Sequence, residues 1–224
     1  VKKMTKDQAA LDFLGGYTGE KITEEDYEQA AKELGCEVAV IKAVAEVESG
    51  GKSGFDSKHR PVILYERHVF ARCTTPPNKY NENNPDISNK KKYKLASIAN
   101  KKAIKAGNLN QDDIYGFSYA RLAKAYVLDQ TAALKACSWG KFQILGENHS
   151  EAGFSTVKSY VQAMCISERE QLKAFVKFIK SDRIKKEAAI KKDWRAFAKR
   201  YNGRYYRANK YDTKLKEAYE RHAK

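Results

Sequence analysis

The residues best suited to chemistry lie at the end of an apolar helical segment, in the run Glu46-Val47-Glu48-Ser49-Gly50-Gly51. From Glu37 onward, apolar residues recur at the spacing of one helical face, and Glu48 continues that face. Glu46 lies about 200° around the helix from Glu48, so we expect it to point to solvent with an ordinary pKa. Burial beside apolar neighbours raises the pKa of a carboxyl, which then holds a proton near neutral pH as a general acid must. The two glycines are expected to end the helix and open space for a ligand.

The local sequence leaves an alternative, in which Glu48 is a helix-terminal glutamate that simply reaches water. Ser49 is expected to cap or brace the turn that follows the helix. No His and Asp accompany it in the pattern of a nucleophilic triad, which argues against a serine hydrolase.

Composition narrows the class of partner. The 224 residues carry a formal net charge of +15, which favours an anionic partner such as nucleic acid, a membrane surface or a charged cell-wall polymer. The four cysteines and four histidines are scattered without the spacing of a metal site, so we predict free, buried thiols, no metal and no cofactor. No run of 18 apolar residues and no apolar signal core are present, so we expect a soluble chain without a transmembrane segment. The chain begins at Val1, as an excised part of a longer protein would.

Helical patterns dominate the chain, so we predict a mainly α protein. The predicted helices cover 7–14, 23–34, 37–48, 95–106, 117–136, 167–179, 193–201 and 209–221. Residues 62–65, a short apolar run after Pro61, form the best strand candidate. Residues 74–94 are predicted to be a long polar excursion within one domain, and the Lys-rich runs 90–94 and 185–192 to be solvated faces.

Three clusters resemble, in order along the chain, the motifs of the lysozyme-like and lytic-transglycosylase superfamily. Glu48-Ser49-Gly50 matches its Glu-Ser motif, residues 138–146 contain its Gly-x-x-Gln-Ile motif, and Tyr201-Asn202 matches its Tyr-Asn motif. Each motif is short, and the ordered set carries the resemblance.

Residues 60–70, 146–149 and 201–215 bring the resemblance closer, to the N-acetylmuramidase domain of bacteriophage endolysins. This resemblance implies a lysozyme-like helical domain with a small β-hairpin beside the active-site cleft. It implies that residues 1–20 are an N-terminal helix or linker region and that 21–224 are a single catalytic domain. Three positions depart from the family pattern: Tyr65 stands where Phe is usual, Lys141 where an apolar residue is common, and Arg204 where Pro is usual.

In that family the glutamate of a Val-Glu-Ser motif is the essential acid, which implies Glu48, and a second glutamate in a Leu-Phe-Glu-Arg-His motif implies Glu66. Glycoside hydrolysis needs such a pair, one acid for the leaving oxygen and one group to activate water or stabilise the developing cation. A glycine turn and a strand separate the two, so the chain can fold back and place Glu66 across a cleft from Glu48. The alternative for Glu66 is an ion pair with Arg67 or another basic residue.

Four further residues are candidates for the glycan groove. Gln143 and Asn148 carry amides that suit acetamido and hydroxyl groups of a sugar, although both are also able to bond the protein's own turns. Tyr201 and Asn202 end a helix. The ring of Tyr201 is expected to pack in the core, and its hydroxyl to act in the cleft. Near the C-terminus, the spacing of Tyr211 and Leu215 is typical of a packed helix, which argues against a specific nucleic-acid face.

We interpret the chain as a peptidoglycan-degrading endolysin that hydrolyses the β-1,4 bond between N-acetylmuramic acid and N-acetylglucosamine. The alternatives are a lytic transglycosylase, which forms 1,6-anhydromuramyl products, a non-catalytic basic wall-binding module, and a chitinase-like enzyme. The expected partners are glycan strands and anionic wall or outer-membrane polymers, and the expected state is a monomer. Such a protein is made in the host cytoplasm and reaches the wall after membrane permeabilisation.

Overall fold

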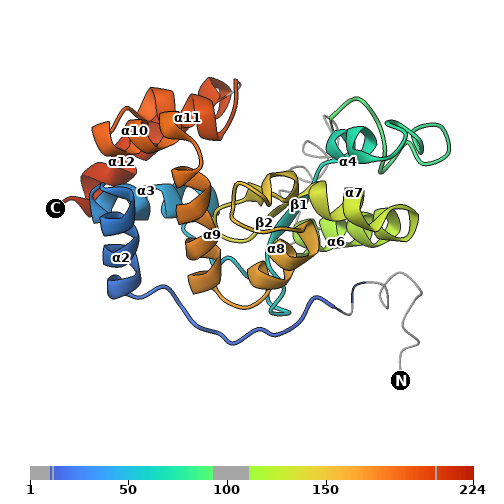
Figure 1. The fold of residues 1–224 in the computed structure, drawn as a ribbon, viewed down its shortest axis with the longest axis horizontal. Helices are drawn as coiled ribbons and strands as arrows, with labels where there is room; N and C mark the ends of the chain where they lie inside the picture. The colour runs from blue at the N-terminus through green and yellow to red at the C-terminus, as the bar shows by residue number, and fades with distance from the viewer. Residues whose placement is uncertain (1–10, 12, 93–110, 205) are drawn as a thin grey trace.

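The structure, a computed structural model, describes residue 11 and residues 13–92, 111–204 and 206–224. It is mostly helical with one small antiparallel sheet (Figure 1). The helices up to the middle of the chain are α2 (Glu24–Leu34), α3 (Val38–Ser49), α4 (Arg67–Cys73), α6 (Gln111–Leu128) and α7 (Gln130–Lys135). The later helices are α8 (Val157–Met164), α9 (Glu168–Lys180), α10 (Arg183–Lys191), α11 (Trp194–Tyr201) and α12 (Tyr211–His222). Two short 3-10 helices are η1 (Gly146–Asn148) and η2 (Tyr206–Asn209).

Local capping sets several helix ends where the sequence predicts them. The Thr23 side chain accepts a hydrogen bond from the Asp26 N–H at 3.2 Å, and the Asp26 carboxylate accepts one from the Thr23 N–H, which together form a capping box. The side chains of Ser167 and Asp193 cap α9 and α11 by accepting from the N–H groups of Glu170 and Ala196. Gly50 ends α3 with a left-handed φ of 61°, a conformation that glycine adopts without steric cost.

The sheet contains strands β1 (Ile63–Tyr65), β2 (Cys137–Trp139) and β3 (Ile144–Leu145) in that order. β2 and β3 form a hairpin, and β1 pairs antiparallel with β2, with Ile63 opposite Trp139. The predicted small β-hairpin is therefore present, and it is extended by the strand predicted over 62–65. The residue ranges of β2 and β3 were not predicted, because strands of two or three residues are too short to show alternation of apolar and polar side chains.

Some helices differ from the predicted pattern. The single helix predicted over 117–136 is two helices, because Asp129 has extended backbone and its side chain caps α7 by accepting from the Ala132 N–H at 2.9 Å. Helices α4, α8 and α10 were not predicted, and α10 contains most of the Lys-rich run 185–192. The helix predicted over 95–106 lies outside the described residues, as does most of 7–14, where residues 11 and 13 lie in turns. The described part of the polar excursion, 74–92, consists of turns and bends, as expected.

The elements form two groups with α9 between them (Figure 1). One group holds α2, α3 and α10 to α12, and the other holds the sheet with α4 and α6 to α8. One contiguous apolar core runs through both groups, and its largest fully buried side chains include Trp139, Tyr65, Phe142 and Phe175. Consequently α3, which carries Glu48, and β1, which leads to Glu66, belong to different groups. Within the described ranges, no helix has the length and apolarity needed to cross a membrane.

Candidate active site

Glu48 lies in the last turn of α3 with its side chain partly buried. Its Oε1 accepts a hydrogen bond from Asn202 Nδ2 at 2.7 Å, which joins the end of α3 to the end of α11. Burial raises the pKa of Glu48 to about 7, and the Asn202 hydrogen bond and the charge of Lys214 oppose that rise without cancelling it. The expectation that helical phase gives this carboxyl a raised pKa is confirmed.

Glu46 has a different environment on the same helix. Its carboxylate pairs with Arg221 and with His222 Nε2, the latter at 2.8 Å, both from α12. Burial acts to raise the pKa of Glu46, but these hydrogen bonds and charges outweigh it, and the pKa is lowered. The expectation of an ordinary pKa is therefore wrong, because nothing local in the sequence reveals that α12 packs on α3.

The backbone after Glu48 turns sharply. Ser49 Oγ donates to the Ala45 carbonyl at 2.6 Å, which braces the last helical turn as expected. Gly50 and Gly51 both have positive φ, 61° and 76°, and their N–H groups both donate to the Glu46 carbonyl in the last turn of α3. The loop then leads to β1 and Glu66.

Glu66 lies at the end of β1 and immediately before α4, where its N–H donates to the Ala136 carbonyl at 2.8 Å. Its Oε2 is 3.4 Å from His68 Nδ1. Burial raises the pKa of Glu66, against the opposing charges of Lys92 and Arg72. Burial also lowers the pKa of His68 to about 4, with Lys92 and Arg72 acting in the same direction, so the ring is neutral near pH 7. Arg67, named above as an alternative partner of Glu66, donates to the carbonyls of Pro85, Lys91 and Lys92.

A pocket of about 260 Å³ lies beside Glu66 and receives side chains from both groups of elements. Its lining residues are Glu66, His68, Val69, Arg72, Lys92, Ser138, Gln143, Ile144, Leu145, Asn148, Phe178 and Tyr201. Four of the six predicted site residues therefore line one pocket. The other two, Glu48 and Asn202, bond each other, and Asn202 follows Tyr201 directly in the chain.

The amide of Gln143 braces its own turn. Gln143 has a positive φ of 50°, and its Nε2 donates to the Gly140 carbonyl at 2.9 Å and to the Val62 carbonyl at 3.3 Å. This is the turn-bonding alternative considered for Gln143. Asn148, in η1, lines the pocket, and none of the described residues forms a hydrogen bond with its side chain.

Tyr201 serves mainly as an anchor. Its ring stacks on Phe197 with centroids 5.4 Å apart, as expected for a core ring. Its hydroxyl donates to the Phe142 carbonyl at 2.7 Å, so it holds the Gly140–Gln143 turn against α11. Asn202 donates to Glu48, whereas its buried Oδ1 has no hydrogen-bond partner among the described residues.

Sequence reasoning missed several residues of this pocket, namely His68, Arg72, Lys92 and Ser138. His68 and Arg72 are four residues apart on α4, so a prediction of that helix would have placed both on one face. Arg72 also pairs with Glu147 next to Asn148.

The structure explains why Lys141 stands where the family commonly has an apolar residue. Its Nζ lies 3.8 Å from Oε2 of Glu168, which is buried.

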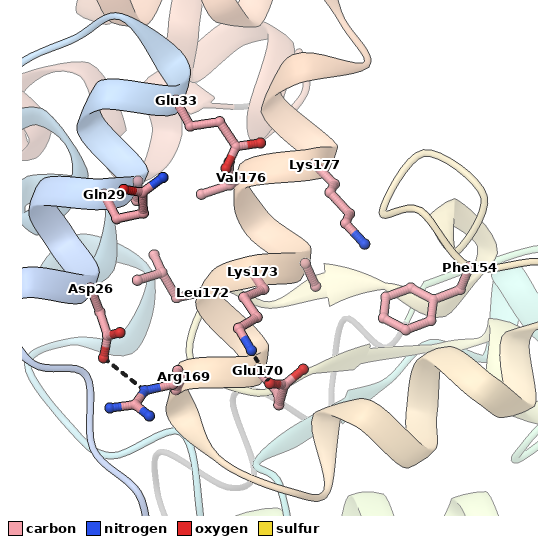
Figure 2. A pocket seen from close by; sticks show the side chains of 12 residues that line it. Asp26, Gln29, Glu33, Phe154, Arg169, Glu170, Leu172, Lys173, Val176 and Lys177 are labelled. Carbon is pink, nitrogen blue, oxygen red and sulfur yellow. Dashed lines mark hydrogen bonds and ion pairs between the residues drawn. The ribbon is translucent and has the colours of Figure 1, made fainter.

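A second pocket, of about 430 Å³, lies between α2 and α9 (Figure 2). None of the predicted site residues lines it. Four of its charged side chains form ion pairs within the pocket, with Asp26 3.0 Å from Arg169 and Glu170 2.5 Å from Lys173, and Glu33 pairs with Lys180. The smaller pocket beside Glu66 is therefore the candidate site.

The described residues contain no cluster of three or more His, Cys, Asp or Glu side chains arranged to hold a metal ion. All four cysteines are free, and the prediction that they are also buried is right for two of them and wrong for the other two. Cys137 and Cys165 are buried, whereas Cys36 and Cys73 are partly exposed.

Comparison with known proteins agrees with this geometry. The sequence profile of the N-acetylmuramidase family matches residues 37–223. The crystal structure of the Burkholderia AP3 phage endolysin is similar, with a TM-score of 0.74 and 38% sequence identity over 90% of this chain and 70% of that one. No curated protein sequence gives a significant match. The chain belongs to the N-acetylmuramidase family and is a lysozyme-type glycoside hydrolase that degrades peptidoglycan.

Proposed function

We propose that the protein hydrolyses the β-1,4 bond between N-acetylmuramic acid and N-acetylglucosamine, with Glu48 as the general acid. The observation that carries this proposal is the environment of Glu48, a partly buried carboxyl whose pKa is about 7 and whose orientation Asn202 fixes. A group with that pKa keeps a large protonated fraction at neutral pH and ionises readily when it gives its proton to the leaving oxygen.

Glu66 is the second carboxylate of the proposal. It lies in the pocket that both groups of elements line, and the cations Arg72 and Lys92 favour its ionised form. In that form it takes a proton from the attacking water or stabilises the positive charge that develops on the sugar ring. The neutral His68 ring beside it adds no charge.

The remaining site residues have supporting roles. Asn148 offers its amide to an acetamido or hydroxyl group of the glycan. Asn202 orients the acid, and Gln143 and Tyr201 shape the turn that lines the pocket.

At the level of the whole chain, we propose that residues 21–224 act as one catalytic domain, as a monomer. The +15 charge supports attraction to anionic wall or outer-membrane polymers. An endolysin of this kind is made in the host cytoplasm and acts on the wall after membrane permeabilisation.

Mass spectrometry of digested peptidoglycan tests the reaction. The wild-type protein is expected to release fragments with reducing muramic acid ends, and Glu48→Gln and Glu66→Gln to release far fewer. Glu46→Gln is the matched control, since it makes the same change two residues from Glu48 in an ion pair on the α12 side. Anhydromuramyl ends would identify a lytic transglycosylase instead, and an active Glu48→Gln variant would remove Glu48 from the mechanism.

A further inference from the structure

Helix α9 carries two buried polar side chains in its first two turns, Glu168 and Gln171, which are 6% and 1% exposed. Oε1 of Glu168 accepts hydrogen bonds from Ser53 Oγ at 2.9 Å and from the Gly54 N–H at 2.8 Å. Glu168 thereby holds the loop that follows the helix of Glu48. Lys141 Nζ, 3.8 Å from Oε2 of Glu168, supplies the opposite charge.

Gln171 bonds in two directions. Its Oε1 accepts from the Lys141 N–H at 2.8 Å, and its Nε2 donates to the Met164 carbonyl at 2.9 Å. Gly54 and Gly140 pack directly against this amide, because a Cβ on Gly54 would lie 2.2 Å from its Oε1 and one on Gly140 would lie 2.5 Å from its Cδ. Neither distance is possible for real atoms, so both glycines are needed for this close approach.

The two side chains join segments that are distant in the sequence. The Gly54 carbonyl accepts from the Val62 N–H at 2.9 Å, and the Val62 carbonyl accepts from the Gly140 N–H at 2.8 Å and from Gln143 Nε2 at 3.3 Å. A continuous set of hydrogen bonds thus runs from α9 through the loop after α3 to the Gly140–Gln143 turn, which lines the candidate pocket. Tyr201 holds the same turn from α11.

Helix α9 lies between the two groups of elements (Figure 1), so this hydrogen-bond network affects how segments of both groups are placed. Its other side faces the second pocket, where Arg169, Glu170 and Lys173 form surface pairs (Figure 2). On the core-facing side, Glu168 Oε1 and both polar atoms of the Gln171 amide are hydrogen-bonded, and Glu168 Oε2 faces the charge of Lys141. A buried network whose groups have partners rigidifies the segments that it joins.

We propose that Glu168 and Gln171 are positioning residues for catalysis: they fix the loop after Glu48 relative to the Gly140–Gln143 turn and so set the geometry of the glycan-binding pocket. This inference rests on the proposed function, in which Glu48 is the acid. Misplacement of reacting groups by about 1 Å costs on the order of 100-fold in rate, so loss of the network is expected to lower kcat more than it raises KM.

The first test compares Gln171→Met with Glu170→Gln. Methionine matches the length of glutamine but leaves the Lys141 N–H and the Met164 carbonyl without partners, whereas Glu170→Gln removes a surface charge one residue away on the same helix. On soluble glycan oligomers, well below the unfolding temperature, Gln171→Met is expected to lower kcat about 10- to 100-fold with KM within about threefold. Glu170→Gln is expected to match wild type. A wild-type kcat per folded molecule in Gln171→Met would overturn the inference.

The second test is a pH-dependent rescue by Gln171→Glu. A protonated glutamic acid restores both hydrogen bonds, because its hydroxyl donates to the Met164 carbonyl and its other oxygen accepts from the Lys141 N–H. Ionisation removes that donor, so the ratio of variant to wild-type kcat is expected to be highest at low pH and to fall as pH rises. A purely structural role predicts that this ratio, measured per folded molecule, stays constant with pH.

Measuring Glu48→Gln in parallel separates the two levels of the proposal. If Glu48→Gln retains activity, the proposed function fails. If Glu48→Gln is inactive while Gln171→Met turns over like wild type, the positioning inference alone fails.

Discussion

The raised pKa of Glu48 implies that the residue costs stability above neutral pH. Its pKa is about 7 in the folded protein against 4.5 for an unperturbed glutamate, so its favourable contribution is complete below pH 4.5 and is lost as pH rises through about 7. Glu48→Gln keeps an acceptor for Asn202 and removes the charge. We expect it to stabilise the protein by about 2 kcal/mol at pH 8 and to have little effect at pH 4, measured by urea unfolding.

Glu46→Gln is the control for that comparison. It is expected to lower the free energy of unfolding at high pH, the opposite of the effect of Glu48→Gln. The pKa of Glu46 is lowered, so its contribution is present at high pH and lost as pH falls. Stabilisation by Glu48→Gln at both pH values alike would contradict the raised pKa.

The hydrogen bond from Asn202 predicts a shift in the pH profile of catalysis. Activity requires protonated Glu48, so kcat is expected to fall as pH rises through about 7. Asn202 stabilises the ionised carboxylate, so Asn202→Ala should move this basic limb to higher pH, by up to about one unit, while the maximal kcat also falls. Asn148 lines the pocket and is not a hydrogen-bond partner of Glu48. Asn148→Ala should therefore raise KM and leave the basic limb of the pH profile at the same pH. A limb that moves to lower pH in Asn202→Ala would refute the assignment.

Among the elements, α11 holds the Gly140–Gln143 turn through the hydroxyl of Tyr201, which donates to the Phe142 carbonyl. Tyr201→Phe keeps the stacked ring and leaves the Phe142 carbonyl without this donor, which should cost about 1 to 2 kcal/mol of stability and lower kcat. Tyr80→Phe removes a comparable bond to the Leu128 carbonyl, away from the pocket. Thermal unfolding should show similar losses in both variants, and kinetics a lower kcat in Tyr201→Phe alone. Equal kcat values would mean that the turn keeps its place without this anchor.

The sequence predicts those elements whose signals are local. Thr23, Ser167 and Asp193 cap helices within three residues of themselves, so those starts are readable, and the 3.6-residue period places Glu48 on the buried side of α3. Strand β2 is different, since its three residues become a strand only by pairing with β1.

The residues of the candidate site also divide into those that local sequence signals predict and those that only the fold brings together. The family motifs along the chain predict Glu48, Glu66 and Gln143 as site residues, but the hydrogen-bond partner of Glu48 comes from a segment far away in the sequence. Asn202 meets Glu48 across 154 positions and α12 supplies the partners of Glu46, and neither contact leaves a periodic trace. The buried carboxylate of Glu168 explains Lys141 only once the fold brings the two together.

On the scale of the molecule, two groups of elements meet at a pocket, and a single core runs through both. The two proposed carboxylates come from elements of different groups, Glu48 from α3 and Glu66 from the residue before α4, and α9 lies between the two groups (Figure 1). Their relative position therefore depends on the whole fold, which is why composition and spacing suggest the pair but not its geometry.

The net charge of +15 predicts how the rate depends on salt. Attraction between exposed charges is screened over about 10 Å at 0.1 M salt and about 3 Å at 1 M, so encounter with an anionic wall should slow as salt rises. Turnover within the pocket involves partly buried groups at short range and is screened much less. We therefore expect kcat/KM on intact cell walls to fall at least about tenfold between 0.05 and 0.5 M salt, while kcat at saturating substrate stays within about twofold. Turbidity assays on walls across a salt series measure both quantities, and an equal fall in kcat would mean that salt acts on the site itself rather than on encounter.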